Sequence, residues 1–347
     1  MMRIIDRLGW KRPELQPWQR PQGPLATEEE IYHCFRLLLG RAPGRKEWHG
    51  HRLTAGTPLR DIVAKFLSCA EFKQRDLSVE SRHATRHEIV ELADFRMWIS
   101  TKDDVCGSLR TAKVYEPGVT SLLRRLLGPG MTFVDAGANI GYFSLLASSL
   151  VTDTGRVLAV EPYPYNIKVL QANVSLNGRS NIEILPYALA DRRGLLCYDD
   201  SAGNSGNVLR LDDDLDRLLR SCIIHAVRLD EVLPVEARID VIKMDIEGAE
   251  HMALKGMAGL LRSSQSVIIT EVAHDFLQQV SGVGLEEYLQ ALLLDETYTF
   301  GIIHHGSDAV ELCGPSTDQV LDRYSRQGSI CMDIVAFPEG KAAVVAS

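Results

Sequence analysis

A turn rich in glycine and acid is the part of this sequence best suited to hold a small molecule. An apolar run ends in Asp135, and Gly137 and Gly141 follow at the start of an expected helix. The glycines permit a tight turn and let the backbone approach a ligand closely at the carboxyl edge of a sheet. The next apolar run ends in Glu161, and an acid in that position commonly accepts hydrogen bonds from both hydroxyls of a ribose.

The spacing of these residues favours a ligand without a pyrophosphate. A dinucleotide site carries the pattern G-x-G-x-x-G, which the segment from Asp135 to Gly141 lacks. A loop with fewer glycines and an acid at its head suits a cationic, phosphate-free ligand better. S-adenosylmethionine, which has an ammonium and a sulfonium group, fits this description. The alternative interpretation is that Asp135 caps the helix and that Glu161 is ordinary surface charge.

Three carboxylates follow a later apolar run, Ile239–Met244. Asp245, Glu247 and Glu250 stand in a turn that opens a helix. They could bind a divalent metal, act as a general base on a substrate hydroxyl, or cap the helix and favour its dipole. We assign a catalytic role to Asp245 and Glu247. We predict no metal, because the sequence offers no identifiable companion ligand.

Other polar residues near the expected strand ends are weaker candidates. Histidine titrates near neutrality and could take a proton from a hydroxyl, although an isolated histidine is more often structural. The histidines in question are His225, His274, His304 and His305. The polar loop Gly203–Asn207 could close over an acceptor or could equally be an exposed turn.

The elements that position these residues alternate along the chain. Short apolar, β-branched runs separated by helical segments predict an α/β fold with a mostly parallel sheet covered by helices on both faces. The last two strands are expected to form an antiparallel hairpin at one edge. The expected strands are Thr132–Asp135, Val157–Glu161, Ile182–Leu185, Val241–Met244, Val267–Val272, Tyr298–Ile303 and Ile334–Phe337.

The N-terminal part of the chain has a different character. Residues 1–26 carry four spaced prolines and are expected to form an extended arm or linker. Residues 27–76 show helical periodicity and predict a small all-α domain that begins at a Thr27 cap. The charged segment 77–112 is expected to be a connector, and 113–340 the catalytic domain.

Composition excludes several other classes of protein. The net charge of −8 and the pI of about 5.7 argue against nucleic acid as a partner. The seven cysteines are scattered without a C-x-x-C pair, so we expect neither a disulfide framework nor structural zinc. No apolar run approaches the roughly 20 residues of a membrane span, and residues 1–10 are too short and charged for a secretory signal. We therefore expect a cytoplasmic protein.

The segment from about Val114 to Pro338 resembles the FkbM-type methyltransferases, a family of class I enzymes with a Rossmann-like fold that depend on S-adenosylmethionine. The resemblance rests on Tyr115–Pro117, Phe133–Ser144, Val160–Pro162, Asn166, Ala188–Ala190, Leu229–Asp230 and Lys243–Glu250. It implies that the segment 187–190 lies near the adenine and Glu161 at the ribose. The implied cofactor-binding residues are Glu116, Asp135, Gly137, Asn139, Gly141, Glu161, Pro162, Ala188 and Asp245, of which Asp135, Gly137, Asn139 and Gly141 line the methionine end.

The N-terminal helices resemble a second family, the helical DUF4214 module related to the phycobilisome linker fold. The residues that carry this likeness are Tyr32, Phe35–Pro43, Phe66–Ser68 and Glu71–Phe72. The module occurs as an appendage on bacterial sugar-modifying enzymes, which implies a sugar or glycan acceptor and a role in binding a protein partner or in self-association. The alternative is an incidental three-helix bundle.

Together these features predict an O-methyltransferase acting on a hydroxyl of a sugar, a glycan or a glycosylated metabolite, with N-methylation left open. One alternative is a non-catalytic protein that binds S-adenosylmethionine and recruits partners. Another is an NAD-dependent oxidoreductase, which would need the glycine pattern for pyrophosphate that is absent here.

Overall fold

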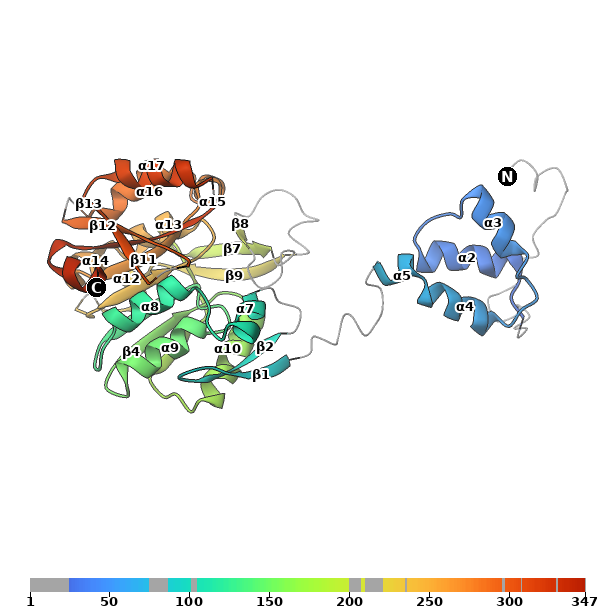
Figure 1. Ribbon diagram of the computed structural model, residues 1–347, viewed down its shortest axis with the longest axis horizontal. Coiled ribbons are helices and arrows are strands. Elements are labelled where there is room, and N and C mark those ends of the chain that lie inside the picture. Colours follow the sequence, from blue (N-terminus) through green and yellow to red (C-terminus); the bar gives the residue numbers. More distant parts are fainter. Residues whose placement is uncertain are drawn as a thin grey trace. The chain divides into compact units, whose positions relative to one another are not determined.

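The chain forms two compact units, Met1–Thr85 and Arg86–Ser347, in the computed structural model (Figure 1). The structure describes residues 25–74, 87–100, 105–199, 207–209, 221–234, 236–294, 297–306, 308–328 and 330–346. Residues 1–24 of the expected arm 1–26 and most of the loop Gly203–Asn207 lie outside the described residues. Within the described part, no helix is both long and apolar enough to cross a membrane.

The first unit is helical, as expected. Its core contains Phe35 and Phe66, whose rings meet edge to face with centroids 4.8 Å apart. Thr27 begins the first helix with a capping box, because its hydroxyl accepts from the Glu30 amide and the Glu30 carboxylate accepts from the Thr27 amide. The helices are α2 (Glu28–Leu38), α3 (Arg45–Arg52), α4 (Leu59–Ser68) and α5 (Ala70–Gln74).

An eight-stranded sheet forms the centre of the second unit, in the order β13-β12-β14-β11-β10-β3-β4-β5. The five strands from β11 to β5 are parallel, and β14 runs antiparallel to β11 and β12. This confirms the expected α/β fold with a mostly parallel sheet. The strands are β3 (Thr132–Ala136), β4 (Arg156–Val160), β5 (Ile182–Leu185), β10 (Val241–Met244), β11 (Val267–Val272), β12 (Tyr298–Ile303), β13 (Val310–Gly314) and β14 (Met332–Pro338).

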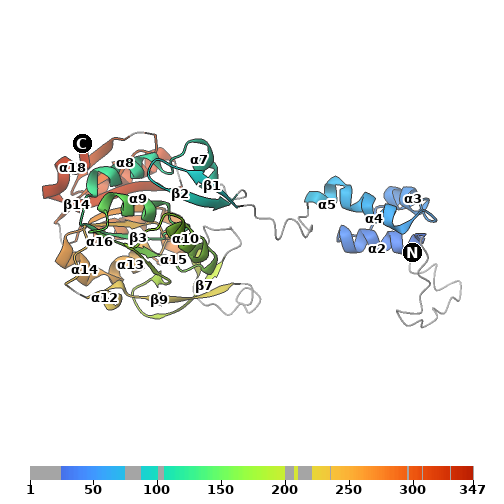
Figure 2. The ribbon, with the colours of Figure 1, turned by 90° about the horizontal axis from the view of Figure 1, so that it is seen from below.

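Helices cover both faces of this sheet (Figure 2). Because successive strand residues point to opposite faces, Phe133 packs in one core and Val134 in the other. The first face carries α7 (Val105–Thr111), α8 (Pro117–Leu126), α9 (Tyr142–Val151), α10 (Pro164–Leu176) and α18 (Ala342–Ala346). The second carries α12 (Leu229–Val232), α13 (Glu250–Gly256), α14 (Ala258–Ser264), α15 (His274–Val280), α16 (Leu285–Leu292) and α17 (Thr317–Gln327).

The structure differs from the sequence analysis at one edge of the sheet and in the segment before it. The two last expected strands pair antiparallel, but β14 lies inside the sheet and β13, which was not predicted, forms the edge. Where a connector was expected, β1 (His87–Glu91) and β2 (Arg96–Ser100) form an antiparallel hairpin. The hairpin belongs to the second unit, since Asn173 on α10 accepts a hydrogen bond from the Trp98 amide at 2.7 Å.

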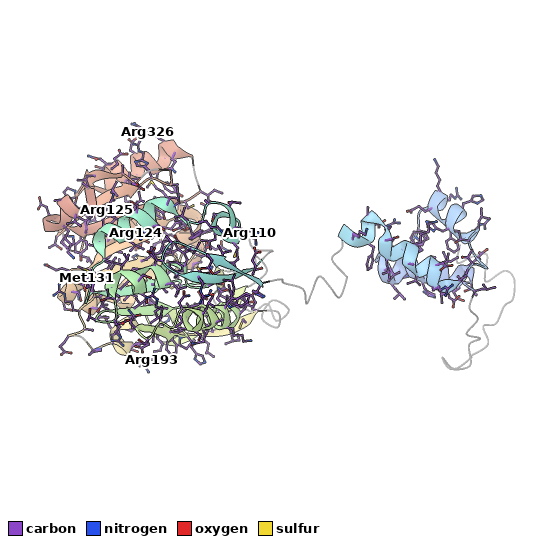
Figure 3. All side chains as sticks on the ribbon, turned by 60° about the horizontal axis from the view of Figure 1, so that its bottom comes forward. Arg110, Arg124, Arg125, Met131, Arg193 and Arg326 are labelled. Atoms are coloured by element: carbon purple, nitrogen blue, oxygen red, sulfur yellow. The ribbon has the colours of Figure 1, made fainter. Side chains whose placement is uncertain are left out.

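Arginine side chains form ion pairs and hydrogen bonds between the helices and the hairpin that cover this sheet (Figure 3). Arg110 on α7 pairs with Glu88 on β1, and Arg124 on α8 pairs with Asp94 in the hairpin turn. Arg125 donates to the carbonyl oxygen of Val345 in the C-terminal helix. These contacts tie the hairpin and the C-terminus to the face of the sheet that carries α8.

A second, four-stranded sheet lies between β5 and β10 in the chain and was not predicted. Its strands, in the order β6-β9-β7-β8, are β6 (Ala188–Leu189), β9 (Cys222–Val227), β7 (Gly194–Asp199) and β8 (Asn207–Leu209). One face buries Tyr198, Ile224 and Ala226. Leu195 and Ile223 are exposed on the other face. The buried face packs beside the pocket described below.

Candidate active site

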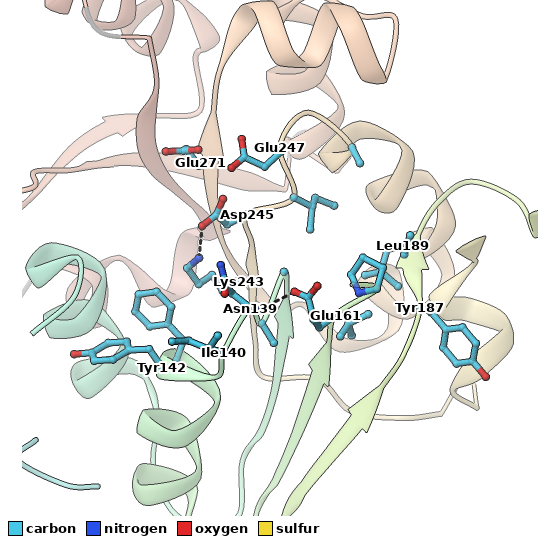
Figure 4. A pocket seen from close by; sticks show the side chains of 18 of the residues that line it. Asn139, Ile140, Tyr142, Glu161, Tyr187, Leu189, Lys243, Asp245, Glu247 and Glu271 are labelled. Atoms are coloured by element: carbon cyan, nitrogen blue, oxygen red, sulfur yellow. Dashed lines mark hydrogen bonds and ion pairs between the residues drawn. The ribbon is translucent and has the colours of Figure 1, made fainter. Parts of the chain in front are cut away.

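A pocket opens at the carboxyl ends of β3, β4, β10 and β11 (Figure 4). It holds about 1130 Å³ of empty space, including the part open to solvent. Eight of the ten sequence-predicted site residues line it. They are Glu116, Gly137, Asn139, Glu161, Pro162, Ala188, Asp245 and Glu247.

The turn after β3 has the backbone geometry that its glycines suggest. Gly137 has a φ of +86°, and a Cβ atom there would overlap the carbonyl oxygen of Asp245. Gly141, at φ +99°, begins α9, and a Cβ atom would overlap the side chain of Leu170. Asn139 also has positive φ, at 48°. The two glycines adopt this conformation without strain. Positive φ in a non-glycine residue such as Asn139 is strained, and strain of this kind concentrates at functional sites.

Glu161 is held at one end of the pocket by two backbone amides. Its Oε2 accepts from the Asn139 amide and its Oε1 from the Tyr163 amide, both at 2.8 Å. Burial raises the pKa of Glu161 to about 7 even though these hydrogen bonds lower it. The Asn166 side chain donates a third hydrogen bond to this carboxylate. A carboxylate has about four acceptor positions, so Glu161 retains capacity for a hydroxyl donor from the pocket.

Asp135 and Gly141 do not line the pocket, contrary to the expectation that they meet the methionine end of a cofactor. Asp135 is the penultimate residue of β3 and points beneath α9, where its Oδ2 accepts from the Ser144 hydroxyl at 2.6 Å. Its Oδ1 finds no hydrogen-bond partner among the described residues. Burial raises the pKa of Asp135, and the nearby Lys243 ammonium opposes this shift.

Lys243 is a buried cation at the centre of the site. Its side chain is 5% exposed, and its Nζ lies 2.9 Å from Oδ2 of Asp245. The ammonium also sits over the Phe143 ring, 4.6 Å from the centroid, which is a favourable cation–π arrangement. Burial alone would lower the pKa of Lys243, but Asp245 and Glu116 outweigh it and the net shift is upward.

Carboxylates gather around Asp245 at the other end of the pocket. Figure 4 shows Glu247 and Glu271 on the side away from Glu161. Burial, with Asp245 as the largest charged contributor, raises the pKa of Glu247 to about 8. Burial also raises the pKa of Glu116 to about 7, against the opposing effect of Lys243. Glu116 and Glu247 both have positive φ, at 40° and 54°.

The three carboxylates after β10 have separate roles. Glu250 lies outside the pocket, where its Oε1 accepts from the amides of Ile246 and Gly248 at 3.0 and 3.3 Å and so caps the turn. Asp245 and Glu247 face the pocket instead. In the described part of the chain, no three His, Cys, Asp or Glu side chains are grouped so that they could hold a metal ion.

The four candidate histidines are absent from the lining of the pocket. His225 is exposed on β9, and His274 Nδ1 accepts from the Leu285 amide at 3.4 Å. His304 pairs with Glu311 at 3.3 Å, and His305 lies 3.6 Å from Asp333.

Sequence reasoning missed Lys243, Glu271 and the aromatic side chains of the lining. A lysine inside an otherwise apolar strand is a usable signal, because a buried ammonium requires a nearby anion. Glu271 near the end of β11 is the equivalent acidic signal. Tyr198 comes from the unpredicted second sheet and stacks on Tyr163, with centroids 4.7 Å apart and planes at 16°.

About half of this chain is similar to a known family of methyltransferases. Residues 135–300 match the Methyltransferase FkbM domain. This FkbM match contains the β3 turn, Glu161, Lys243, Asp245, Glu247 and Glu271. It leaves out Glu116, which reaches the pocket from the start of α8.

The curated relatives cover part of the chain. It is 30% identical over 154 residues to Methyltransferase sdnD of Sordaria araneosa, covering 36% of this chain and 59% of that protein. It is 28% identical over 145 residues to Methyltransferase 1 of Beauveria bassiana, covering 36% and 57%. The chain therefore spans less than two thirds of the length of these relatives.

A solved structure of Methyltransferase FkbM from Methylobacillus flagellatus is also similar, at 16% identity and a TM-score of 0.39. The alignment covers 88% of this chain and 58% of that one.

Proposed function

We propose that the second unit is an S-adenosylmethionine-dependent methyltransferase that methylates a hydroxyl of a sugar, a glycan or a glycosylated metabolite. One observation carries the choice of methyl donor. Glu161 is fixed by the amides of Asn139 and Tyr163 at one end of a pocket whose other end is acidic. This arrangement suits a ribose at one end and a cation at the other.

The charge of the pocket supports S-adenosylmethionine over a dinucleotide. Among the described lining residues the only Lys or Arg is Lys243, and Asp245 already pairs with it. Glu116 and Glu271 add further carboxyl groups, and a bound cation would favour their ionised forms. These carboxylates would repel a pyrophosphate, whereas they would attract an ammonium and a sulfonium group.

The proposed contacts follow the two ends of the pocket. Glu161 would hold the ribose, and Ala188 with its neighbours would lie beside the adenine. Asp245, held by Lys243, would face the cationic methionine end together with Asn139. Gly137 has no side chain, so the β3 turn can pack directly against the backbone of Asp245. This close packing leaves space in the pocket for the methionine end of the cofactor.

When bound, S-adenosylmethionine supplies a methyl group made electrophilic by the sulfonium. The protein must align an acceptor oxygen with this group, keep water out and receive the hydroxyl proton. We assign the alignment to Asp245 and Glu247. With a pKa of about 8, Glu247 is mostly protonated at neutral pH and can donate a hydrogen bond to the acceptor as well as accept one.

The preference for a sugar rests on two supports of different kinds. The first is the resemblance of the N-terminal helices to an appendage of sugar-modifying enzymes, which is an association. The second is the lining itself, where Glu247 and Glu271 offer hydrogen bonds to hydroxyls, and Tyr115 and Tyr142 offer aromatic surface. The helical unit would then contact a protein partner or a second copy of the chain.

Transfer of a labelled methyl group from S-adenosylmethionine to a panel of sugars and glycans tests this proposal. The wild-type chain should label at least one hydroxyl acceptor. Glu161→Gln should lose most of the labelling, because its amide would place N–H groups against a backbone N–H donor. Glu183→Gln is the matched control, because Glu183 is an exposed glutamate on β5. Equal labelling by both variants would contradict the role of Glu161, and labelling only of amines would contradict O-methylation.

A further inference from the structure

Glu271 and Asp333 face each other across two strands beside the pocket. They are directly opposite in the antiparallel pair of β11 and β14, so their side chains project to the same side of the sheet with Cβ atoms roughly 5 Å apart. Glu271 lines the pocket. Asp333 is 6% exposed and lies outside the lining.

Titratable and charged side chains from the neighbouring elements surround this pair. Lys243 faces it from β10, and Asp245 and Glu247 from the turn after β10. Tyr115 and Glu116 face it from the residues before α8. The Cys331 thiol donates a hydrogen bond to Glu271. Beyond Asp333, the ring of His305 lies 3.6 Å from its carboxylate and is 53% exposed. The pair thus connects the interior of the pocket to a histidine at the surface.

Two ionised carboxylates directly opposite each other are unfavourable, and more so when buried. Lys243 cannot neutralise both, because its ammonium already pairs with Asp245. Burial raises the pKa of Glu271 and of Asp333. Asp245 raises the pKa of Glu271 further, and the charges of Glu116, Glu271 and Asp245 raise that of Asp333. A single proton held between the two removes most of this repulsion, as in other carboxylate dyads.

We propose that Glu271 and Asp333 share one proton and that Glu271 is the base that receives the proton of the acceptor hydroxyl. This inference rests on the proposed methyl transfer. In the step, the acceptor oxygen forms a bond to the methyl carbon as the sulfur–methyl bond breaks, leaving a neutral thioether. The hydroxyl proton goes to the ionised oxygen of Glu271. The proton already on Asp333 can leave through His305 to solvent, which restores the singly protonated pair. Asp333 and His305 are positioning residues in this scheme.

Infrared difference spectra at about pH 7 test the shared proton without any turnover. The carbonyl stretch of one protonated carboxyl should disappear in Glu271→Gln and likewise in Asp333→Asn. The double variant should lose no more than either single variant, because both remove the same proton. A double variant that loses the sum of two separate bands, or single variants that lose none, would overturn the shared proton.

Kinetics then test the role of Glu271. Glu271→Gln should lower kcat about 100-fold, as for removal of a general base, with the Kd for S-adenosylhomocysteine unchanged within about twofold. At low ionic strength, His305→Gln should move the acid limb of the kcat/KM profile to higher pH, and His305→Lys should restore it or move it lower. His304→Gln is the matched control and should leave the limb in place.

The outcomes distinguish a wrong assignment of the base from a wrong proposal of methyl transfer. An intact kcat in Glu271→Gln, or identical shifts in both His305 variants, would overturn the assignment of the base and its neighbours. A wild-type chain that binds S-adenosylhomocysteine but transfers no methyl group would contradict the proposed function and the base together. The infrared result would still decide whether the shared proton exists.

Discussion

The pKa of Glu161 leads to a quantitative prediction about cofactor binding. Glu161 must be ionised to accept a hydrogen bond from the ribose while it keeps those from Asn139, Tyr163 and Asn166. Its pKa in the ligand-free protein is about 7, so about 3% is ionised at pH 5.5 and nearly all at pH 8.5. A ligand that donates hydrogen bonds to the carboxylate lowers this pKa, and binding then releases a proton at low pH.

The size of the effect follows from the two pKa values. If the bound state restores the ordinary value of 4.5, affinity at pH 5.5 is about 30-fold weaker than at pH 8.5, or about 2 kcal/mol. The sign is fixed by the raised pKa, since the carboxylate is lost as the pH falls through about 7. S-adenosylhomocysteine suits this experiment because it lacks the sulfonium charge that would respond to the other carboxylates.

Isothermal titration calorimetry of S-adenosylhomocysteine at pH 5.5, 7.0 and 8.5, in buffers of different ionisation enthalpy, measures both the affinity and the released proton. Glu161→Gln should bind more weakly at every pH and should lose most of the pH dependence. Glu183→Gln should behave like the wild type. An affinity of the wild type that stays within about twofold from pH 5.5 to 8.5 would refute the assigned state of Glu161.

Three further predictions concern other parts of the chain. Lys243→Met should raise the pKa of Glu116 further by removing its neutralising cation, so the acid limb of the methyl-transfer pH profile should move to higher pH. Exposed Lys168→Met should leave the profile unchanged. Gly137→Ala should destabilise the second unit by about 3 kcal/mol in urea unfolding, because of backbone strain and overlap of the new Cβ atom with Asp245. Gly128→Ala is the control and should be near neutral, because the space at its Cβ is open. Phe66→Ala should destabilise the helical unit by about 3 to 5 kcal/mol and expose it to limited proteolysis, while binding of S-adenosylhomocysteine stays intact. Leu67→Ala is the control and should have little effect, because Leu67 is 41% exposed. A proteolysis pattern shared by both variants would contradict the importance of the Phe35–Phe66 contact.

The parts of the site that sequence could predict are those fixed by local spacing. The β3 turn and Glu161 stand one β-α unit apart, and parallel strands bring their carboxyl ends to the same edge of the sheet. Asp135 was placed at the pocket because its strand was expected to end there. The strand continues to Ala136, so alternation turns Asp135 under α9 toward Ser144.

The parts that sequence could not predict depend on pairing between distant segments. Glu271 and Asp333 meet only because β14 lies between β11 and β12, and no local pattern specifies that order. The β1-β2 hairpin was obscured by its charged residues, although its apolar positions Val90, Met97 and Ile99 are buried. The second sheet, which supplies Tyr198, consists of short strands whose alternation is weak.

The identity of the ligand is the central claim, and one measurement tests it directly. The full chain should be titrated at about pH 8, where Glu161 is ionised, with S-adenosylhomocysteine and separately with NAD. Saturable binding of S-adenosylhomocysteine with no measurable binding of NAD is the predicted result. Saturable binding of NAD without binding of S-adenosylhomocysteine would contradict the account.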